Sequence, residues 1–167
     1  MCTGSGCVAI AIAHERPAAS VLATDISEAA LAIARRNAAR HNVADRIRFV
    51  CADLLASVPG PFDLIVANPP YIPDRDIDDL APEVRDHEPR TALAGGPDGL
   101  CALRKILAQA ADTLATGGWL VMEMGAGQAR DMRAAVAADD RYDDATVAAD
   151  LAGVERVIAV RRSDSEN

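Results

Sequence analysis

Short apolar segments that suit β-strands alternate along this chain with longer segments that have helical periodicity. We expect strands at residues 20–24, 47–51, 62–67, 119–124, 145–149 and 155–160, and helices at 6–15, 28–41, 99–115 and 128–138. Strands that are connected through helices pair in parallel, whereas strands joined by a short turn pair in antiparallel fashion. The order therefore predicts an α/β fold with a mostly parallel sheet and an antiparallel strand at its C-terminal end.

Local signals refine this assignment. Ser27 is a good N-cap for the helix at 28–41, because its side-chain oxygen can accept a hydrogen bond from the first helical turn. The strand at 62–67 is apolar almost throughout, which predicts burial on both faces. We also expect Trp119, the single tryptophan, in the core. Residues 68–98 hold six of the nine prolines and lack periodicity, which is typical of a functional loop or a linker.

Composition limits the class of protein. A chain of 167 residues, half of them hydrophobic, has the size and core of a single globular domain. Its net charge of −8 argues against binding nucleic acid phosphates as a main activity. The sequence has neither a signal-peptide pattern nor the run of about 18 apolar residues that a membrane span needs, so we expect a cytoplasmic protein. The four cysteines form no C-x-x-C pair, which predicts reduced thiols and no metal site.

A glycine-containing loop and two acidic residues form a candidate nucleotide site. The loop consists of Thr3, Gly4, Ser5 and Gly6. Glycines let a backbone approach a ligand closely, and the N-terminus of the helix that follows offers free N–H groups. Asp25 ends the next strand, where a carboxylate can bind both hydroxyls of a ribose, and Asp53 could meet an adenine edge one strand later. The alternatives are a structural turn for the loop, an N-cap for Asp25 and a helix or turn cap for Asp53.

The segment Asn68-Pro69-Pro70-Tyr71 is the most specific motif of the chain. It follows the strand at 62–67 directly. Proline removes a backbone donor, so carbonyl groups here are left free to accept hydrogen bonds. The Asn68 side-chain oxygen and a neighbouring carbonyl can hold the two hydrogens of an –NH₂ group, and Tyr71 can lie against its plane. Such a grip orients a planar amide or amine nitrogen for attack on an electrophile.

Together these motifs resemble those of the class I S-adenosylmethionine-dependent methyltransferases, whose fold is Rossmann-like. More narrowly, the sequence resembles the HemK-type protein-glutamine N5-methyltransferases, which modify the Gly-Gly-Gln loop of translation release factors. Further segments that fit this family lie at 87–90, 95–100, 117–119, 122–125 and 150–157. The last of these favours the release-factor branch over the branch that methylates a ribosomal protein.

The resemblance implies an activity, a cofactor and a set of site residues. The activity is methyl transfer from S-adenosylmethionine to the side-chain amide N5 of a glutamine in a release factor, without a metal and with no nucleic acid or membrane partner. Asn68 and the Pro69 carbonyl would hold the amide, Tyr71 would shape the pocket, and Pro70 completes the motif. The implied cofactor-binding residues are Thr3, Gly4, Ser5, Gly6, Asp25, Ile26, Asp53, Leu54 and Asn68.

The sequence departs from the family at its start. The family's first strand and its N-terminal helical domain, which docks the protein substrate, have no counterpart here. We therefore expect residues 1–160 to be a methyltransferase catalytic domain that is incomplete at its N-terminus, with a polar tail at 161–167. An incomplete central sheet predicts low stability or activity for this chain alone. Cys2 and Leu54 also stand where relatives often carry glycine and an aromatic residue.

Three other functions are compatible with the same motifs. An Asn-Pro-Pro-Tyr grip also suits the exocyclic amine of adenine, which predicts an adenine-N6 methyltransferase of DNA or RNA. A ribosomal-protein glutamine methyltransferase would use the same residues. A non-catalytic remnant would keep the fold without turnover.

Overall fold

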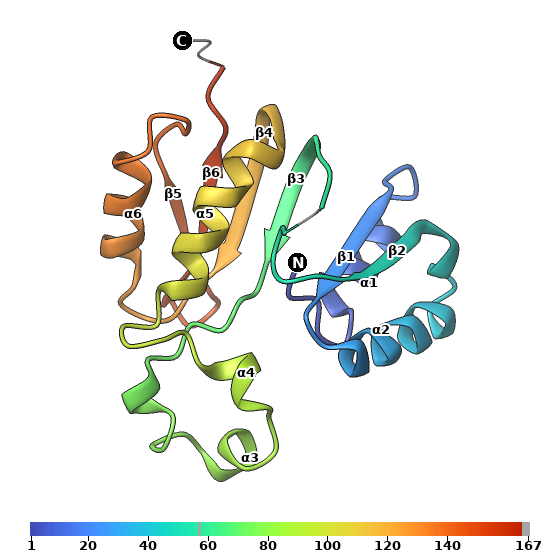
Figure 1. Ribbon diagram of the computed structural model, residues 1–167, viewed down its shortest axis with the longest axis horizontal. Helices are drawn as coiled ribbons and strands as arrows, with labels where there is room; N and C mark the ends of the chain where they lie inside the picture. Colours follow the sequence, from blue (N-terminus) through green and yellow to red (C-terminus); the bar gives the residue numbers. More distant parts are fainter. Residues whose placement is uncertain (57, 165–167) are drawn as a thin grey trace. The chain divides into compact units, whose positions relative to one another are not determined.

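The computed structural model describes residues 1–56 and 58–164 and divides into two compact units, Met1–Val58 and Pro59–Asn167 (Figure 1). Strand pairing follows this division. Among the described residues, β1 and β2 form a two-stranded sheet in the first unit, and β3, β4, β6 and β5, in that order, form a four-stranded sheet in the second. No described helix is both long enough and apolar enough to cross a membrane.

The first unit is a small α/β layer built on aliphatic side chains. Its elements are α1 (Cys7–Glu15), β1 (Val21–Asp25), α2 (Glu28–Arg40), the 3-10 helix η1 (Ala44–Arg46) and β2 (Ile47–Cys51). Strands β1 and β2 pair in parallel from Val21 opposite Ile47 to Asp25 opposite Cys51. The Ser27 side chain accepts a hydrogen bond from the Ala30 N–H at 3.2 Å, which confirms the predicted N-cap of α2.

The second unit carries the larger sheet. Its elements are β3 (Phe62–Ala67), the 3-10 helix η2 (Asp74–Asp76), α3 (Pro82–Arg85), α4 (Arg90–Leu93), α5 (Cys101–Thr113), β4 (Leu114–Glu123), α6 (Ala129–Ala137), β5 (Thr146–Ala149) and β6 (Glu155–Arg161). Strands β3 and β4 are parallel, and β6 runs antiparallel to both β4 and β5. The predicted mixed sheet with one antiparallel C-terminal strand is thus confirmed. The predicted loop at 68–98 contains three short helical turns.

The two faces of the larger sheet differ in burial. Helix α5 packs against β4 and α6 against β6, and the strand residues on one face are buried. On the other face Leu64 is 48% exposed and its cross-strand neighbour Trp119 is 42% exposed. The predictions of a strand β3 buried on both faces and of Trp119 in the core are therefore wrong. An apolar sequence marks a strand, but it does not tell whether a helix covers each face.

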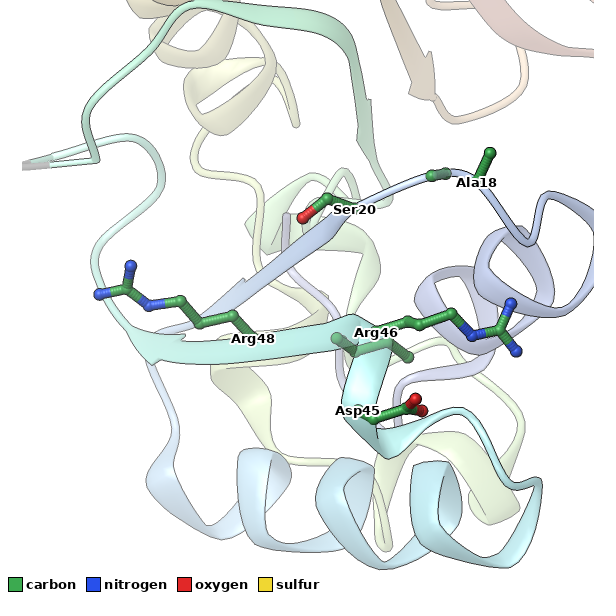
Figure 2. A pocket seen from close by; sticks show the side chains of 7 residues that line it. Ala18, Ser20, Asp45, Arg46 and Arg48 are labelled. Carbon is green, nitrogen blue, oxygen red and sulfur yellow. The ribbon is translucent and has the colours of Figure 1, made fainter.

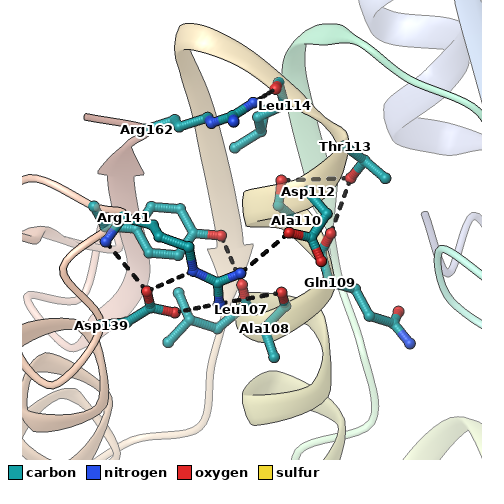
Figure 3. Close-up of polar contacts among 11 residues, drawn as sticks. Leu107, Ala108, Gln109, Ala110, Asp112, Thr113, Leu114, Asp139, Arg141 and Arg162 are labelled. Carbon is teal, nitrogen blue, oxygen red and sulfur yellow. Dashed lines mark hydrogen bonds and ion pairs between the residues drawn. The ribbon is translucent and has the colours of Figure 1, made fainter. Parts of the chain in front are cut away.

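Arg141 attaches the segment after α6 to helix α5 (Figure 3), and the adjacent Tyr142 contacts the same helix. The Arg141 guanidinium binds both carboxylate oxygens of Asp139, at 2.8 and 2.7 Å, and one oxygen of Asp112 at 3.2 Å. The buried Tyr142 hydroxyl donates a hydrogen bond of 2.6 Å to the Leu107 carbonyl. Tyr142 also bridges to Arg162, just beyond the end of β6, so the chain stays attached to the sheet into the predicted polar tail. Residues 165–167 of that tail lie outside the described residues.

Replacing Tyr142 with phenylalanine is expected to lower the free energy of unfolding by about 1 kcal/mol, because it removes one buried hydrogen bond and keeps the ring. Burial also raises the pKa of Tyr142. The folded chain therefore keeps this proton above about pH 10, where an unfolded tyrosine loses it, and stability falls as the pH rises through that range. Urea denaturation at neutral and alkaline pH measures both effects. A phenylalanine variant with the wild-type stability and the same alkaline loss would contradict this role.

Candidate functional site

The loop at the start of the first unit is closed by its own backbone and packed on helix α2. The Thr3 N–H donates to the Thr24 carbonyl at 3.0 Å, and the Gly6 N–H donates to the Thr3 carbonyl at 2.8 Å. Gly6 has a φ of +88°, and a Cβ built on it would lie 3.0 Å from the Ala34 Cβ. Only glycine tolerates both this backbone conformation and this contact. The loop therefore leads directly into the N-terminus of α1.

Asp25 lies at the carboxyl end of β1 and binds the same loop. Its Oδ2 accepts a hydrogen bond from the Gly4 N–H at 2.8 Å, and its Oδ1 accepts one from the Ser27 N–H at 2.9 Å. Ser27, not Asp25, is the N-cap of α2, so the capping interpretation of Asp25 is wrong. A carboxylate has acceptor positions for about four hydrogen bonds. Each oxygen of Asp25 thus keeps capacity to accept a further donor.

Three other residues predicted for cofactor binding, Ile26, Asp53 and Leu54, belong to the first unit as well, whereas Asn68 belongs to the second. Burial raises the pKa of the Cys2 thiol to about 11, and the charges of Asp25 and Asp53 contribute to the rise although the N-terminal amino group opposes it. Ile26 is 64% exposed, and Leu54 has a left-handed backbone with a φ of 54°. The structure thus places the loop and Asp25 in direct contact, with Ile26, Asp53 and Leu54 in the same unit.

In the second unit, the Asn68–Tyr71 segment leaves the carboxyl end of β3. Asn68 is exposed and Pro69 is fully buried. The Tyr71 hydroxyl donates to Oε1 of Glu123, at the end of β4, over 3.0 Å. Burial together with this carboxylate raises the pKa of Tyr71. Tyr71 is therefore a neutral hydrogen-bond donor whose ring position is fixed from β4.

Gln128 and Gly95 donate hydrogen bonds to two backbone carbonyl groups, one at the end of the motif and one just after it. The Tyr71 carbonyl accepts from the Gln128 side chain at 2.9 Å, and the Ile72 carbonyl accepts from the Gly95 N–H at 2.8 Å. Within the described part of the chain, neither the Pro69 carbonyl nor the Asn68 side chain has a hydrogen-bond partner. These two groups are the acceptors that the sequence predicts for an –NH₂ group.

Sequence reasoning missed Gln128, which it treated only as the start of a helix. Its side chain also accepts a hydrogen bond from the Gly125 N–H at 2.7 Å. The Gln128 N–H in turn donates to the Gly125 carbonyl at 3.2 Å, so the two residues form a closed turn just before α6. The sequence carries no signal for this turn, because Gly125 has no side chain and glutamine is not a typical helix N-cap.

Two surface hollows lie in the first unit. One, of about 340 Å³, is lined by Ala18, Ala19, Ser20, Asp45, Arg46, Ile47 and Arg48 (Figure 2). The Arg46 side chain lining it already donates to the Ala13 carbonyl at 2.6 Å, and this hollow contains none of the predicted site residues. The second, of about 580 Å³, lies beside α1 and α2 and includes Ser5 of the predicted loop. Over the described residues, no group of three or more His, Cys, Asp or Glu side chains is arranged to bind a metal ion.

Curated proteins of known name match nearly the whole chain. A release factor glutamine methyltransferase from Bradyrhizobium diazoefficiens is 47% identical over 160 residues, which cover 96% of this chain and 54% of that protein. A protein of the same name from Gloeobacter violaceus is 44% identical over 157 residues, which cover 93% of this chain and 55% of that protein. The chain thus spans about half the length of these relatives.

Solved structures and a family profile agree on the fold. A ribosomal protein L11 methylase from Lactobacillus delbrueckii subsp. bulgaricus is 28% identical, with a TM-score of 0.68 over 96% of this chain and 66% of that protein. A methyltransferase from Pyrococcus furiosus is 18% identical, with a TM-score of 0.70 over 96% of this chain and 72% of that protein, and shows the fold alone. The fold is that of the class I methyltransferases. The profile of the methyltransferase small domain matches residues 1–84, half of the sequence, and the chain belongs to this family.

Proposed function

We propose that this chain carries the catalytic domain, residues 1–160, of a cytoplasmic protein-glutamine N5-methyltransferase. It transfers a methyl group from S-adenosylmethionine to the side-chain amide nitrogen of a glutamine in a translation release factor. The observation that carries this proposal is the identity of 41–47% to several proteins named release factor glutamine methyltransferase. Since the chain spans about half of their length, the substrate and the reaction are part of the proposal.

The first unit supplies the residues that fit the cofactor. The oxygens of Asp25 are oriented by Gly4 and Ser27 and retain acceptor capacity, which suits the two hydroxyls of a ribose. The exposed Ile26 and the half-buried Leu54 offer apolar contacts for an adenine, and Asp53 is an acceptor for its amine. Thr3, Ser5 and Gly6 complete the loop at the start of α1. When bound, S-adenosylmethionine supplies an electrophilic methyl group.

The second unit supplies the residues that fit the amide. The Asn68 side-chain oxygen and the Pro69 carbonyl each accept one N–H of the glutamine side chain, which orients its nitrogen. Pro70 keeps the backbone in the required conformation, and the neutral Tyr71 limits the space beside the amide plane. Orientation of this kind can account for several orders of magnitude in rate, so no nucleophilic side chain is needed.

A transfer assay tests this proposal. The chain is incubated with S-adenosylmethionine labelled on its methyl group and with a release factor, a variant of that factor with alanine in place of the glutamine of its Gly-Gly-Gln motif, duplex DNA, or ribosomal proteins. We expect label, at a low rate for this chain alone, on the intact release factor and on none of the other substrates. Label on DNA or on a ribosomal protein would identify one of the alternative enzymes. Cofactor binding without any transfer would indicate a non-catalytic form.

A further inference from the structure

Gln128 joins two chain segments that are far apart in sequence. It lies immediately before α6, and its residue is only 9% exposed. Its Nε2 donates to the Tyr71 carbonyl at 2.9 Å, while its Oε1 accepts from the Gly125 N–H at 2.7 Å. One side-chain amide therefore connects the segment that follows β3 with the residue that follows β4. Both hydrogen bonds are partly buried, so each restricts the groups that it joins.

Gly99 and Gly125 leave the space that the Gln128 amide occupies, and Gly95 leaves space for the Tyr71 backbone. A Cβ on Gly99 would lie 2.6 Å from Nε2 of Gln128 and 2.3 Å from the Tyr71 oxygen. A Cβ on Gly125 would lie 3.0 Å from Oε1 of Gln128, and one on Gly95 would lie 2.8 Å from the Tyr71 Cα. Real Cβ atoms do not approach other atoms below about 3 Å, because of hard-sphere repulsion. The surroundings of Gln128 are therefore built closely around its two hydrogen bonds.

The consequence concerns the groups that the proposed function assigns to the substrate amide. Tyr71 is held at both ends, at its hydroxyl by Glu123 and at its carbonyl by Gln128. With one lone pair of the Tyr71 carbonyl used by Gln128, the acceptors that have no partner within the described residues lie upstream, at Asn68 and Pro69. Only a side chain with one donor and one acceptor in a plane, at the length of glutamine, makes both contacts of Gln128.

We propose that Gln128 is a positioning residue that holds the Asn68–Tyr71 segment in the conformation that binds the substrate amide. The effect on catalysis rests on the proposed function. The effect on the conformation of the Asn68–Tyr71 segment rests on the two hydrogen bonds of Gln128 alone. Gln128 itself does not touch the substrate in this proposal.

Amide hydrogen exchange tests the structural part without any activity. The variant Gln128→Met keeps the side-chain length and removes both hydrogen bonds, and Arg130→Met, at an α6 side chain that is 91% exposed, is the control. We expect the amides of Gly125, Ile72 and Gly95 to exchange at least about tenfold faster in Gln128→Met, with α5 and β4 unchanged. Wild-type exchange at these three amides would overturn the proposal. Equal acceleration throughout the second unit would also overturn it, since Gln128 would then contribute only to global stability.

The catalytic part is tested by a second pair of variants. In Gln128→Glu, an ionised carboxylate still accepts from Gly125 but cannot donate to Tyr71, whereas the protonated acid can do both. Lowering the pH increases the protonated fraction of this carboxyl. We expect kcat to fall about 100-fold in Gln128→Met, with KM and cofactor affinity changed less than about threefold. The kcat of Gln128→Glu relative to wild type should rise as the pH is lowered from about 8 to about 6, while that of Gln128→Met stays flat.

The two parts can fail separately. If wild-type protein transfers no methyl group but Gln128→Met loosens only the three amides, the proposed function fails and the positioning role stands. If wild-type protein is active and Gln128→Met keeps its kcat, the catalytic consequence is wrong. A loss expressed mainly in KM would also overturn it, because misplaced acceptors impair the reaction more than they impair binding of a whole protein.

Discussion

Replacing Asn68 with alanine is expected to reduce methyl transfer at least about 1,000-fold while cofactor affinity stays within a few-fold. Removal of one preorganised hydrogen-bonding group from an active site typically costs about 100- to 1,000-fold in kcat. Asn68 is also the only side chain in the proposed amide grip, beside the Pro69 carbonyl. The exposed Asn68 has no structural hydrogen bond within the described chain, so its removal leaves no orphaned partner.

Asn68→Asp is the informative companion to this variant. An aspartate keeps an acceptor oxygen at the same distance from the backbone, so we expect it to retain more activity than alanine. Methyl transfer is followed with labelled cofactor, cofactor affinity by calorimetric titration, and folding by thermal melting. An Asn68→Ala protein with near wild-type turnover would remove the amide grip from the proposal. An equal loss of methyl transfer in both variants would show that the acceptor oxygen at position 68 does not contribute to catalysis.

Replacing Asp25 with alanine is expected to weaken S-adenosylmethionine binding at least about 100-fold. A hydrogen bond to a charged group contributes roughly 1.5–3 kcal/mol, or about 10- to 100-fold in affinity, and two ribose hydroxyls would use this carboxylate. The same change leaves the N–H groups of Gly4 and Ser27 without their acceptor. The loop before α1 should therefore become less ordered, which adds to the loss.

Two further variants help to separate the loss of hydrogen bonds to the ribose from the loss of order in the loop. Asp25→Asn keeps one acceptor oxygen and is expected to bind the cofactor with an intermediate affinity. Asp45→Ala removes an exposed acid of the same unit, in η1, and should bind like wild type. Calorimetric titration with S-adenosylmethionine gives each dissociation constant. Unchanged affinity in Asp25→Ala would show that another part of the chain binds the ribose.

Elements whose limits depend on local chemistry were predicted well from the sequence. The strands β2 and β3 have the predicted bounds, and the N-cap at Ser27 is confirmed, because a serine oxygen next to the first helical turn acts within a few residues. The loop before α1 and Asp25 were also recognised as neighbours from their places at a helix start and a strand end.

Features that depend on contacts between distant segments were not predicted. Leu64 and Trp119 looked like core residues, because an apolar side chain does not reveal which sheet face a helix covers. Gln128 binds Tyr71 across 57 positions of sequence, and its other partner, Gly125, has no side chain that would mark the contact. The contact between the Tyr71 hydroxyl and Glu123 likewise depends on how the ends of β3 and β4 pair.

The half-exposed indole of Trp119 on β4 is an intrinsic fluorescence probe of the second unit. Trp119 is the single tryptophan of the chain, so all intrinsic indole emission comes from one position on the sheet face opposite α5 and α6. A dissolved quencher reaches this ring in the free protein, and a bound partner on that face would block the collisions. A blue shift of the emission together with reduced quenching would therefore report coverage of this face, without any chemical label and independently of catalysis.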